Sequence, residues 1–557
     1  MIKIPAPNKL LQELFFKQLE ISKVTAQILI NRGITDTEEA YNFLNTSLDN
    51  LLDPFSFTDM EKAVNLVRTH ARQKNKIMVF GDYDVDGVTS TALLKNTLSR
   101  MGIEASHYLP HRVKEGYGLS KNIVSIVKEK DIKLLITVDC GTSSHKELKA
   151  LEHAGVDVIV TDHHEPADST HPQAQAVINP KLKNSGYKYR DLAGVGVAYK
   201  LCQAITQDKL IDDLDLVSLG TIADVVPLSG ENRIIAKFGL AGMANTNKAG
   251  LYALIENSGI KNKKITSTFI GFILGPRINA SGRVGTAQAS LDLLMARDKS
   301  EAEVLAKVLE KCNRERQKIE GKIMEEALSV IEREVNFKEH KVIVVSGSGW
   351  HQGVLGIVAS KIADRFYRPA IVISEDDILC KGSGRSIKNF HLFHALTECS
   401  EFLDNFGGHS HAVGLNISRN NIVDFKNKIN NIAYEKLSLE DLVPSLDVDM
   451  ELSLSDINNG LITELEMLEP FGTGNPAPLF YTANLKLKSR PQLLGRDTIK
   501  FWLTDSNTVF QAIGFSKGRF MDSLVNADYF DMVYTIRRDT WQGRTSTLLE
   551  IKDIIFK

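Results

Sequence analysis

Short apolar runs alternate with stretches of helical periodicity in the first third of the chain. Residues 77–80, 134–138 and 156–160 are apolar or nearly apolar, and each run has about the length of one buried strand. Residues 122–130 and 144–154 lie between these runs and have a helix-like pattern. Buried strands that alternate with helices are typical of a parallel α/β sheet, so we expect such a sheet here.

A much longer helical pattern follows over residues 301–334. This stretch contains no Pro and a single Gly, Gly321, and its apolar residues recur near helical spacing. As one continuous helix it would be about 50 Å long at the standard rise per residue. A helix of that length more often connects two domains than fills one core, so we expect a connector.

A second α/β pattern begins after this helix, and a strand-rich pattern ends the chain. Residues 342–345 and 370–373 are predicted strands, with a helix at 354–366 between them. From about residue 446 short strands and turns dominate, which fits a small β-barrel. The predicted barrel strands are 485–487, 499–503, 509–515, 532–536 and 547–551.

These patterns predict an α/β protein with a parallel-sheet domain, a long connecting helix, a second α/β domain and a C-terminal β-barrel. Residues near the N-terminus read as helical and mixed, without a chemical motif. The expected segments are 1–70 for that N-terminal part, 71–296 for the first domain, 297–335 for the connecting helix, 336–440 for the second domain and 441–557 for the barrel.

Composition places the chain among ordinary globular proteins. It has 557 residues, of which 43% are hydrophobic and 24% charged, and its formal net charge is −2. That balance excludes a uniformly basic nucleic-acid protein but allows a local basic groove. The start lacks a signal-peptide pattern, and no apolar run approaches the ~20 residues of a membrane span. The five cysteines form no Cys-x-x-Cys pair, so we expect a cytoplasmic protein without a cysteine-bound zinc site or a disulfide framework.

Acidic and imidazole side chains follow each of the three strands predicted first. Gly81-Asp-Tyr-Asp-Val-Asp-Gly87 follows the first strand, Asp139 the second, and Asp162-His-His164 the third. Ligands of open α/β sheets bind at the carboxyl ends of the strands, so we expect these side chains to form one cluster. A further acid, Asp224, lies in an apolar stretch, where an unpaired carboxylate is costly.

Asp and His side chains together suit Mn²⁺ or Mg²⁺, with Zn²⁺ as a further option. Closely spaced carboxylates repel one another without cations, so two metals are favoured over none. Two metals a few ångströms apart form a clamp for phosphoryl transfer, so the cluster predicts a metal-dependent phosphoesterase.

The same residues could instead form a calcium loop or a dinucleotide site, or the His-His pair and Cys140 could have no function. A calcium loop would need Glu at its twelfth position, where Leu93 stands, and no strand before it. A dinucleotide site would need Gly-x-Gly-x-x-Gly after one of the strands, and none follows. A His-His pair alone is often incidental, and we expect Cys140 to be a spectator because no base is evident near it in the sequence.

Glycine-rich segments suggest a second site, in the second α/β domain. Residues 346–353, 382–386 and 406–409 read as loops, and loops before helices expose backbone N–H groups to anions. The guanidinium group of Arg385 can donate two parallel hydrogen bonds to a phosphate, so these segments fit phosphate binding. The alternative for each segment alone is an ordinary turn.

Arginines outside that domain are further candidates for contacts to a phosphate backbone. Residues 275–283 read as turn-rich and carry Arg277 and Arg283. Either these arginines contact a substrate backbone or they pair locally, and neither alternative is favoured. Arg112 is a similar candidate.

The motifs together resemble those of the DHH phosphoesterase superfamily. Asp84-x-Asp86, Asp139, Asp162-His-His164 and Asp224 match its four motifs, and Gly407-Gly-His409 resembles its associated DHHA1 domain. Further segments narrow the resemblance to the RecJ family of single-strand-specific 5′→3′ exonucleases. They are Gly81–Gly87, Glu115-Gly-Tyr-Gly118, Gly275-Pro-Arg-Ile-Asn279, Gly349-Trp-His-Gln-Gly353 and Glu469-Pro-Phe-Gly-Thr-Gly-Asn-Pro476, and the resemblance covers nearly the whole chain from about residue 50.

The resemblance implies DHH and DHHA1 domains around a cleft too narrow for duplex DNA, and a terminal OB-fold that grips a single strand. It implies two Mn²⁺ or Mg²⁺ ions, with Asp139 bridging them and His164 contacting the scissile phosphate or helping to protonate the leaving group. The implied metal ligands are Asp84, Asp86, Asp139, His163 and Asp224. Asp82 is a further candidate ligand because of a departure from the family pattern. The implied nucleic-acid contacts are Arg112, Arg277, Asn279, Arg283, Trp350, His351, Ser383, Arg385 and His409.

The chain departs from the family pattern at two places. Many superfamily members have a His where this chain has Phe80, so either Asp82 supplies a replacement ligand or one metal binds weakly. In the barrel, Gly495-Arg-Asp-Thr498 stands where related enzymes often have a His. The barrel aromatics Phe501, Trp502 and Trp541 are equally open to strand stacking and to core packing.

The expected function is therefore removal of 5′ nucleotides from single-stranded DNA in repair and recombination. Expected partners are a single-stranded-DNA-binding protein and a RecQ-type helicase, with no membrane contact and a monomeric chain. One alternative is a phosphoesterase for oligonucleotides or small phosphate substrates, which would need no terminal barrel. Another is an inactive replication scaffold, which loss of the metal acids would indicate.

Overall fold

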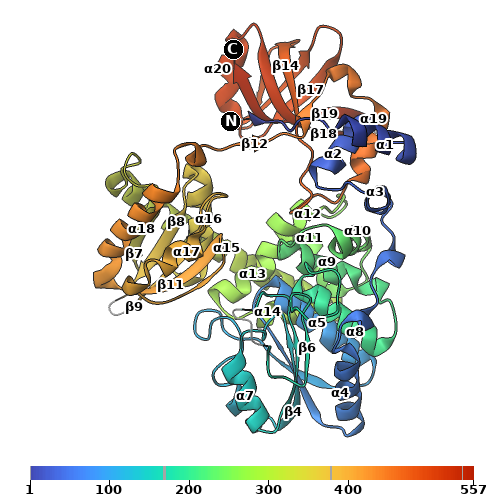
Figure 1. The fold of residues 1–557 in the computed structure, drawn as a ribbon, viewed down its shortest axis with the longest axis vertical. Coiled ribbons are helices and arrows are strands. Elements are labelled where there is room, and N and C mark those ends of the chain that lie inside the picture. The colour runs from blue at the N-terminus through green and yellow to red at the C-terminus, as the bar shows by residue number, and fades with distance from the viewer. Residues whose placement is uncertain (1, 167–170, 377–378, 542–543, 557) are drawn as a thin grey trace. The chain divides into compact units, whose positions relative to one another are not determined.

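We describe the protein from a computed structural model, which describes residues 2–166, 171–376, 379–541 and 544–556 (Figure 1). The chain divides into two compact units, each built from separate stretches. The first unit contains Met1–Leu52, Val225–Lys237 and Ser445–Lys557. The second contains Asp53–Asp224 and Phe238–Pro444.

A five-stranded parallel sheet forms the first half of the second unit. Its strand order is β3-β2-β4-β5-β6, and every neighbouring pair is parallel. The predicted strands at 77–80, 134–138 and 156–160 are confirmed as β2, β4 and β5. The bounds are β2 Lys76–Gly81, β3 Ala105–Tyr108, β4 Ile132–Val138, β5 Asp157–Thr161 and β6 Ala176–Ile178.

Helices cover both faces of this sheet, with α7 on one face and α4 and α8 on the other (Figure 1). Apolar residues of α6 and α7 share one core with side chains from β2, β4 and β5. The helices of this half are α4 Met60–Arg72, α5 Val85–Arg100, α6 Ile123–Glu129, α7 His145–His153, α8 Gly194–Thr206 and α9 Leu214–Ala223.

A helical region leads from this sheet to the second one. The predicted connector is confirmed as the single helix α15, Lys299–Glu334, whose 36 residues span about 54 Å. The expectation of a turn-rich segment at 275–283 is wrong, because α13 occupies it with Pro276 in its first turn, where the missing N–H costs nothing. The helices before α15 are α10 Gly230–Met243, α11 Ala249–Asn257, α12 Ser267–Phe269, α13 Gly275–Val284 and α14 Gln288–Met295.

The second sheet is mixed, with the order β10-β11-β9-β8-β7, and only β7 and β8 are parallel. The expectation of glycine-rich loops is wrong for two of the three segments, since residues 382–385 lie in β9 and residues 406–408 in β10. A Cβ on Gly384 would lie 2.8 Å from Leu392, so here glycine permits close packing. The elements are β7 Ile343–Ser348, α16 Leu355–Phe366, β8 Ala370–Glu375, β9 Leu379–Arg385, α17 Leu392–Thr397, β10 Leu403–Gly408, β11 Ala412–Ser418 and α18 Ile422–Lys436.

The first unit contains a closed five-stranded barrel. The ladder runs β14-β18-β19-β17-β16, and pairing of β14 with β16 closes it. All five predicted barrel strands are confirmed, and five strands in a small barrel are the OB-fold architecture. The strands of this unit are β1 Ile2–Lys3, β12 Leu446–Asp447, β13 Met450–Glu451, β14 Phe480–Leu487, β15 Gln492–Leu494, β16 Thr498–Thr504, β17 Val509–Gly514, β18 Phe530–Trp541 and β19 Arg544–Phe556.

N-terminal helices share the core of this barrel unit. Phe15, Ile28 and Leu29 belong to the same buried cluster as Phe501 and Leu549. The helices are α1 Lys9–Leu19, α2 Lys23–Asn31 and α3 Thr37–Leu44, with α19 Asn459–Met467 and α20 Met521–Asn526 from the C-terminal part. The first 52 residues are thus part of the barrel unit.

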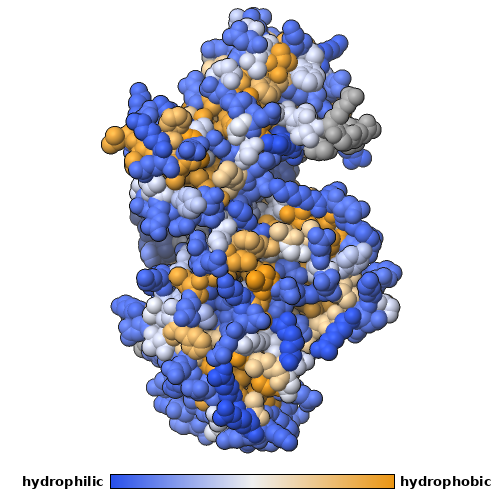
Figure 2. Space-filling model, turned by 90° about the vertical axis from the view of Figure 1, so that its right-hand side faces the viewer, coloured by the Kyte–Doolittle hydropathy of each residue, from blue (hydrophilic) through white to orange (hydrophobic). Residues whose placement is uncertain are grey.

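In the view of Figure 2 hydrophilic side chains cover most of the visible surface, with apolar ones in small groups between them. Among the residues that the structure describes, no helix is both long enough and apolar enough to cross a membrane.

Candidate metal centre and nucleic-acid interface

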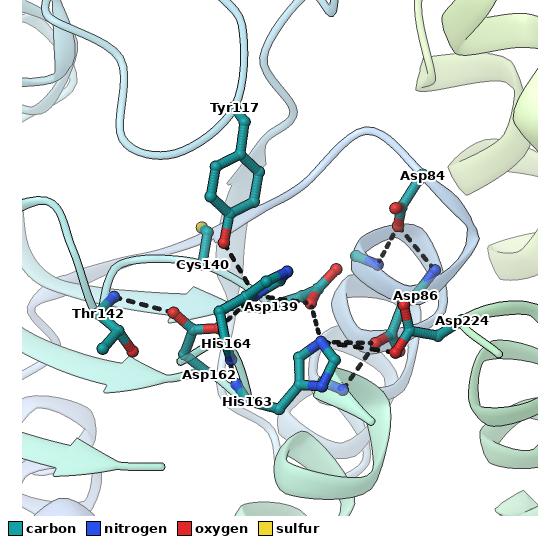
Figure 3. Close-up of polar contacts among 12 residues, drawn as sticks. Asp84, Asp86, Tyr117, Asp139, Cys140, Thr142, Asp162, His163, His164 and Asp224 are labelled. Carbon is teal, nitrogen blue, oxygen red and sulfur yellow. Dashed lines mark hydrogen bonds and ion pairs between the residues drawn. The ribbon is translucent and has the colours of Figure 1, made fainter. Parts of the chain in front are cut away.

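The carboxyl ends of β2, β4 and β5 bring the sequence-predicted acids and histidines to one place, as Figure 3 shows for most of them. Ligand atoms lie within 4.8 Å of one another in three overlapping groups. The groups are Asp82, Asp84 and Asp139; Asp86, His163 and Asp224; and Asp139, His163 and His164. Overlapping groups that share Asp139 and His163 fit a centre with more than one cation.

His163 occupies the middle of this cluster. Its Nε2 lies 3.2 Å from Asp139 Oδ1, 3.6 Å from Asp224 Oδ2 and 3.7 Å from Asp86 Oδ2. No described residue forms a hydrogen bond with Nε2, although the atom is buried. Burial, and then the charge of His164, lowers the pKa of His163 to about 3, so its imidazole is neutral and able to bind a cation.

The backbone at helix starts holds two of the acids. Asp86 accepts hydrogen bonds from the N–H groups of Gly194 (2.6 Å) and Val195 (2.7 Å), at the first turn of α8. Asp84 caps α5 and accepts from the N–H of Asp86 at 3.0 Å. A Cβ on Gly194 would lie 2.6 Å from Asp139 Oδ1, so only glycine lets α8 begin this close to the acids. The cluster is therefore rigidly positioned.

The carboxylates oppose one another's ionisation. Burial, and then the charge of Asp84, raises the pKa of Asp86 to about 7. Burial and neighbouring carboxylates also raise the pKa values of Asp82, Asp139 and Asp224 well above their usual range. Repulsion of this kind is relieved when divalent cations bind between the groups. The donor set, the buried atoms without described partners and the raised pKa values all fit Mn²⁺ or Mg²⁺.

His164 is held differently from His163. Its Nδ1 donates to Asp162 Oδ1 at 2.8 Å, and the hydroxyl oxygen of Tyr117 lies 2.9 Å from the same nitrogen (Figure 3). Asp162 also accepts from the N–H groups of His163 (2.7 Å) and Thr142 (2.9 Å), and it is not a member of any of the three groups above. Burial opposes the charged imidazole, but the bond to Asp162 raises the pKa of His164 above its ordinary value.

Phe80, at the position where the family resemblance leads one to expect a His, is fully buried at the end of β2 and stacks on Tyr108. Its side chain belongs to the core of the sheet. Asp82 is 3% exposed, lies in the group with Asp84 and Asp139, and has a carboxylate oxygen without a hydrogen-bond partner among the described residues. This placement supports Asp82 as the replacement ligand.

Three arginines of the second unit form a cationic counterpart to the acids. Burial, and then the charge of Arg112, lowers the pKa of Arg283 to about 9, and the same two causes lower the pKa of Arg385. Arg283 donates to the carbonyl of Gly353 at 2.9 Å, and Arg112 lies over the ring of Tyr83. No described carboxylate lies within ion-pair distance of any of the three, and the charge of Asp84 only partly offsets the lowering of the pKa of Arg283, so a further anion would relieve the cluster.

The other predicted nucleic-acid contacts divide into two groups. Arg277 pairs with Glu310 at 2.9 Å, which favours local pairing. Asn279 accepts from the N–H of Val85 at 3.2 Å, and Trp350, 4% exposed, donates to Glu326. These three side chains therefore have structural partners.

The second group is more accessible. His351 is half-buried and accepts from the N–H of Gly353, and Ser383 lies on β9 two residues before Arg385. His409 lies at the turn between β10 and β11, and partial burial together with the charge of His164 lowers its pKa. The charge of His164 thus acts on a residue of the second sheet.

In the barrel, Phe501 is 2% exposed and belongs to the core, whereas Trp502 is 45% exposed and remains a stacking candidate. The side chain of Trp541 lies outside the described residues.

Sequence reasoning did not assign a role to Tyr117 or to Asn179, although both support the histidine pair. Asn179 is fully buried and donates to Thr142 Oγ1 (2.8 Å) and to the carbonyl of His164 (2.9 Å). Tyr117 lies in the Glu-Gly-Tyr-Gly segment, so the motif pointed to this region of the sequence. Asn179 follows the short strand β6, and no motif in the sequence pointed to it. Cys140 is buried, which raises the pKa of its thiol well above normal, as expected of a spectator.

Comparison with known proteins identifies the three domains. Residues 76–221 match the DHH family N-terminal domain, residues 339–435 the DHHA1 domain and residues 448–553 the RecJ OB domain. A relative from Bacillus subtilis (strain 168), described as single-stranded-DNA-specific exonuclease RecJ, is 39% identical over 540 residues, which cover 96% of this chain and 68% of the relative.

Two solved structures resemble the whole chain. The crystal structure of RecJ in complex with Mn²⁺ from Thermus thermophilus has a TM-score of 0.84 at 28% identity and covers 100% of this chain and 79% of that one. The complex of RecJ with Mg²⁺ from the same organism has a TM-score of 0.78 at 26% identity, with coverage of 100% and 78%.

Proposed function

The chain belongs to the RecJ family of single-stranded-DNA-specific exonucleases, and from this premise we propose that its two charged clusters act together to remove nucleotides from the 5′ end of single-stranded DNA. The observation that carries the proposal is the set of buried carboxylates gathered around His163, with atoms that lack partners among the described residues. All the acids of the family pattern are present, which disfavours an inactive scaffold, and the OB barrel disfavours a small-substrate phosphoesterase.

We assign Asp82, Asp84, Asp86, Asp139, His163 and Asp224 to the binding of two Mn²⁺ or Mg²⁺ ions. Such ions, when bound, lower the pKa of water and stabilise charge on the phosphoryl oxygens. Asp139 and His163 each belong to two of the three groups, and Asp139, which has two carboxylate oxygens, would be the residue shared by both ions when they are bound. The first turn of α8 fixes Asp86 and thereby limits reorganisation of the centre.

His164 is assigned to the scissile phosphate. Asp162 and Tyr117 act at its Nδ1, so its Nε2 is the nitrogen left to donate to a phosphate oxygen or to the leaving group. Asp162 is a positioning residue, because its hydrogen bonds orient both histidines while its carboxylate stays outside the metal groups.

Arg112, Arg283 and Arg385 are assigned to a phosphate of the bound strand, with Ser383, His351 and His409 as further contacts. Three guanidinium groups without a described carboxylate partner supply the charge-assisted hydrogen bonds that a phosphate accepts. The barrel binds single-stranded DNA, and its exposed Trp502 offers a face on which a base can stack.

The wider setting follows from the family and remains our proposal. It comprises a monomeric chain that acts in DNA repair and recombination, in the cytoplasm, with a single-stranded-DNA-binding protein and a RecQ-type helicase.

The test uses one strand labelled at either end, alone and as a duplex, incubated with Mn²⁺. We expect mononucleotide release from the 5′ end of the single strand only. Asp139→Ala is the matched inactive control. Digestion of the duplex at the same rate, digestion from the 3′ end, or full activity in Asp139→Ala would each refute the proposal.

A further inference from the structure

The motif Glu469-Pro-Phe-Gly-Thr-Gly-Asn-Pro476 has no role in the mechanism above, yet its contacts lead to a metal acid. We propose that this loop is a positioning element for Asp224, so that the barrel unit sets the affinity of the metal centre. The inference rests on the assignment of Asp224 as a metal ligand.

The boundary between the two units falls between Asp224 and Val225. Asp224 ends α9 in the second unit and lies 3.6 Å from His163 Nε2. The next thirteen residues, Val225–Lys237, belong to the first unit. A single peptide bond therefore joins a candidate ligand to a segment held by the barrel unit.

The loop at 469–476 contacts the segment Val225–Lys237 directly. The N–H of Leu228 donates to the carbonyl of Thr473 at 2.7 Å. A Cβ on Gly472 would lie 2.6 Å from Leu228 Cδ1, and a Cβ on Gly474 would lie 3.1 Å from Pro227 Cβ. The loop thus needs glycine at both positions in order to approach the segment this closely.

The loop is itself braced from within. Asn475 is fully buried, and its amide donates to the carbonyls of Leu468 (2.8 Å) and Pro470 (3.0 Å). Arg32 donates to Asn475 Oδ1 at 2.8 Å. The position of Thr473 is therefore fixed by the core of the barrel unit.

The far end of the segment is anchored as well. Arg233 is 2% exposed, and its guanidinium donates to the carbonyls of Phe43, Met467 and Leu468 at 2.8 to 3.0 Å. The segment is thus held at Leu228 and again at Arg233, and only Val225 to Pro227 separate the first anchor from Asp224.

Val225 carries the conformational cost of this connection. It is β-branched, 65% exposed and has φ +64°, in the left-handed region that such residues rarely adopt. A costly backbone conformation persists only where its surroundings impose it. Here the anchored segment that follows Val225 imposes it, and Asp224 is the residue directly before this turn.

The test measures Mn²⁺ binding to the full chain by titration, with electron paramagnetic resonance to count free ions. Gly474→Ala is the main variant, and Gly495→Ala is its matched control. Both glycines have positive φ, +73° and +61°, but a Cβ on Gly495 meets nothing within 4 Å. We expect about tenfold weaker binding at one Mn²⁺ site in Gly474→Ala and parent-like binding in Gly495→Ala.

A cycle with Asp224→Asn separates this inference from the proposed function. If the loop acts through Asp224, then Gly474→Ala has no further effect on Mn²⁺ affinity in the Asp224→Asn background. Gly472→Ala, with partial rescue by Leu228→Ala, gives a second variant should Gly474→Ala fail to fold.

Parent-like Mn²⁺ affinity in both loop variants overturns the inference, and so does an equal loss in Gly495→Ala. An additive effect in the Asp224→Asn background overturns it too. Unchanged affinity in Asp224→Asn alone overturns instead the assignment of Asp224 as a ligand.

Discussion

The acid cluster and the arginine cluster present the same electrostatic problem with opposite signs. Burial and like charge raise the pKa values of Asp82, Asp86 and Asp139, and burial and like charge lower those of Arg283 and Arg385. Each cluster is costly alone and is relieved by an opposite charge. In the function that we propose, a divalent cation supplies that charge at the acids and a DNA phosphate supplies it at the arginines, so each cluster would be suited to its ligand before the ligand arrives.

The difference between the clusters lies in their supports. Backbone N–H groups at helix starts hold Asp84 and Asp86, whereas Arg283 donates to the carbonyl of Gly353 and Arg385 to that of the neighbouring Gly384. Asp and Arg side chains that are merely structural look different, as Arg277 does with its partner Glu310. The absence of a described carboxylate partner therefore distinguishes Arg283 and Arg385 from Arg277.

The largest expected effect comes from the shared acid. Asp139→Asn keeps the shape but removes a bridging charge, and we expect kcat to fall about a thousandfold, or ~4 kcal/mol. The folded-state pKa of Asp139 is raised, so its ionisation opposes folding above its ordinary pKa. At neutral pH the metal-free variant should therefore unfold at a higher temperature than the parent. A lower melting temperature in calorimetry would contradict the self-repulsion that unites the two clusters.

The next effect tests the cationic side. Arg283→Gln removes one phosphate contact, and we expect KM for a 5′-phosphorylated strand to rise roughly 30-fold, or ~2 kcal/mol. The affinity for Mn²⁺ should not change. Steady-state kinetics at several strand concentrations measures the first quantity and metal titration the second. A loss of Mn²⁺ binding would mean that the clusters are one site and not two.

A smaller effect is expected from the support of His164. In Asp162→Asn the side-chain oxygen can still accept hydrogen bonds from the backbone N–H groups, but the negative charge that orients the imidazole of His164 is lost. We therefore expect kcat to fall about tenfold, while KM and Mn²⁺ affinity stay near the parent values. Single-turnover kinetics shows whether the chemical step slows. A collapse of metal binding would instead place Asp162 among the ligands.

The smallest effect is the matched control for the arginines. Arg277→Gln breaks the partly exposed pair with Glu310, which costs less than about 1 kcal/mol of stability. The KM for DNA should change less than about twofold. A rise comparable to that of Arg283→Gln would show that local pairing does not distinguish structural from functional arginines here.

Sequence patterns predicted the parts of the fold whose cause is local. Residues 134–138 are buried on both faces in β4, so they form a continuous apolar run that stands out. Strand β3 was missed because Ala105–Tyr108 lies at the edge of the sheet and is only partly buried. The sequence also misled at 275–283, since its two glycines and its proline do not prevent helix α13.

The site was predictable to the same extent. The acids at strand ends could be expected to meet, because parallel strands deliver their carboxyl ends to one edge. The partners of these acids could not, since the N-terminus of α8 and Asn179 reach the site only through packing. Whether an arginine is paired, as Arg277 is, likewise depends on a residue 33 positions away.

The shared core of the barrel unit also affects the order in which parts of a newly synthesised chain can fold. Phe15, Ile28 and Leu29 belong to the same buried cluster as Leu549, which the ribosome adds about 500 residues later. At roughly 5 to 20 residues per second, about 500 residues of synthesis leave these apolar side chains uncovered for roughly 25 to 100 s. The catalytic sheet can fold during that interval, whereas the first three helices must wait for the final strands. Newly made chains should therefore need protection mainly at these three helices, and a chain that stops short of the barrel would keep their apolar side chains exposed.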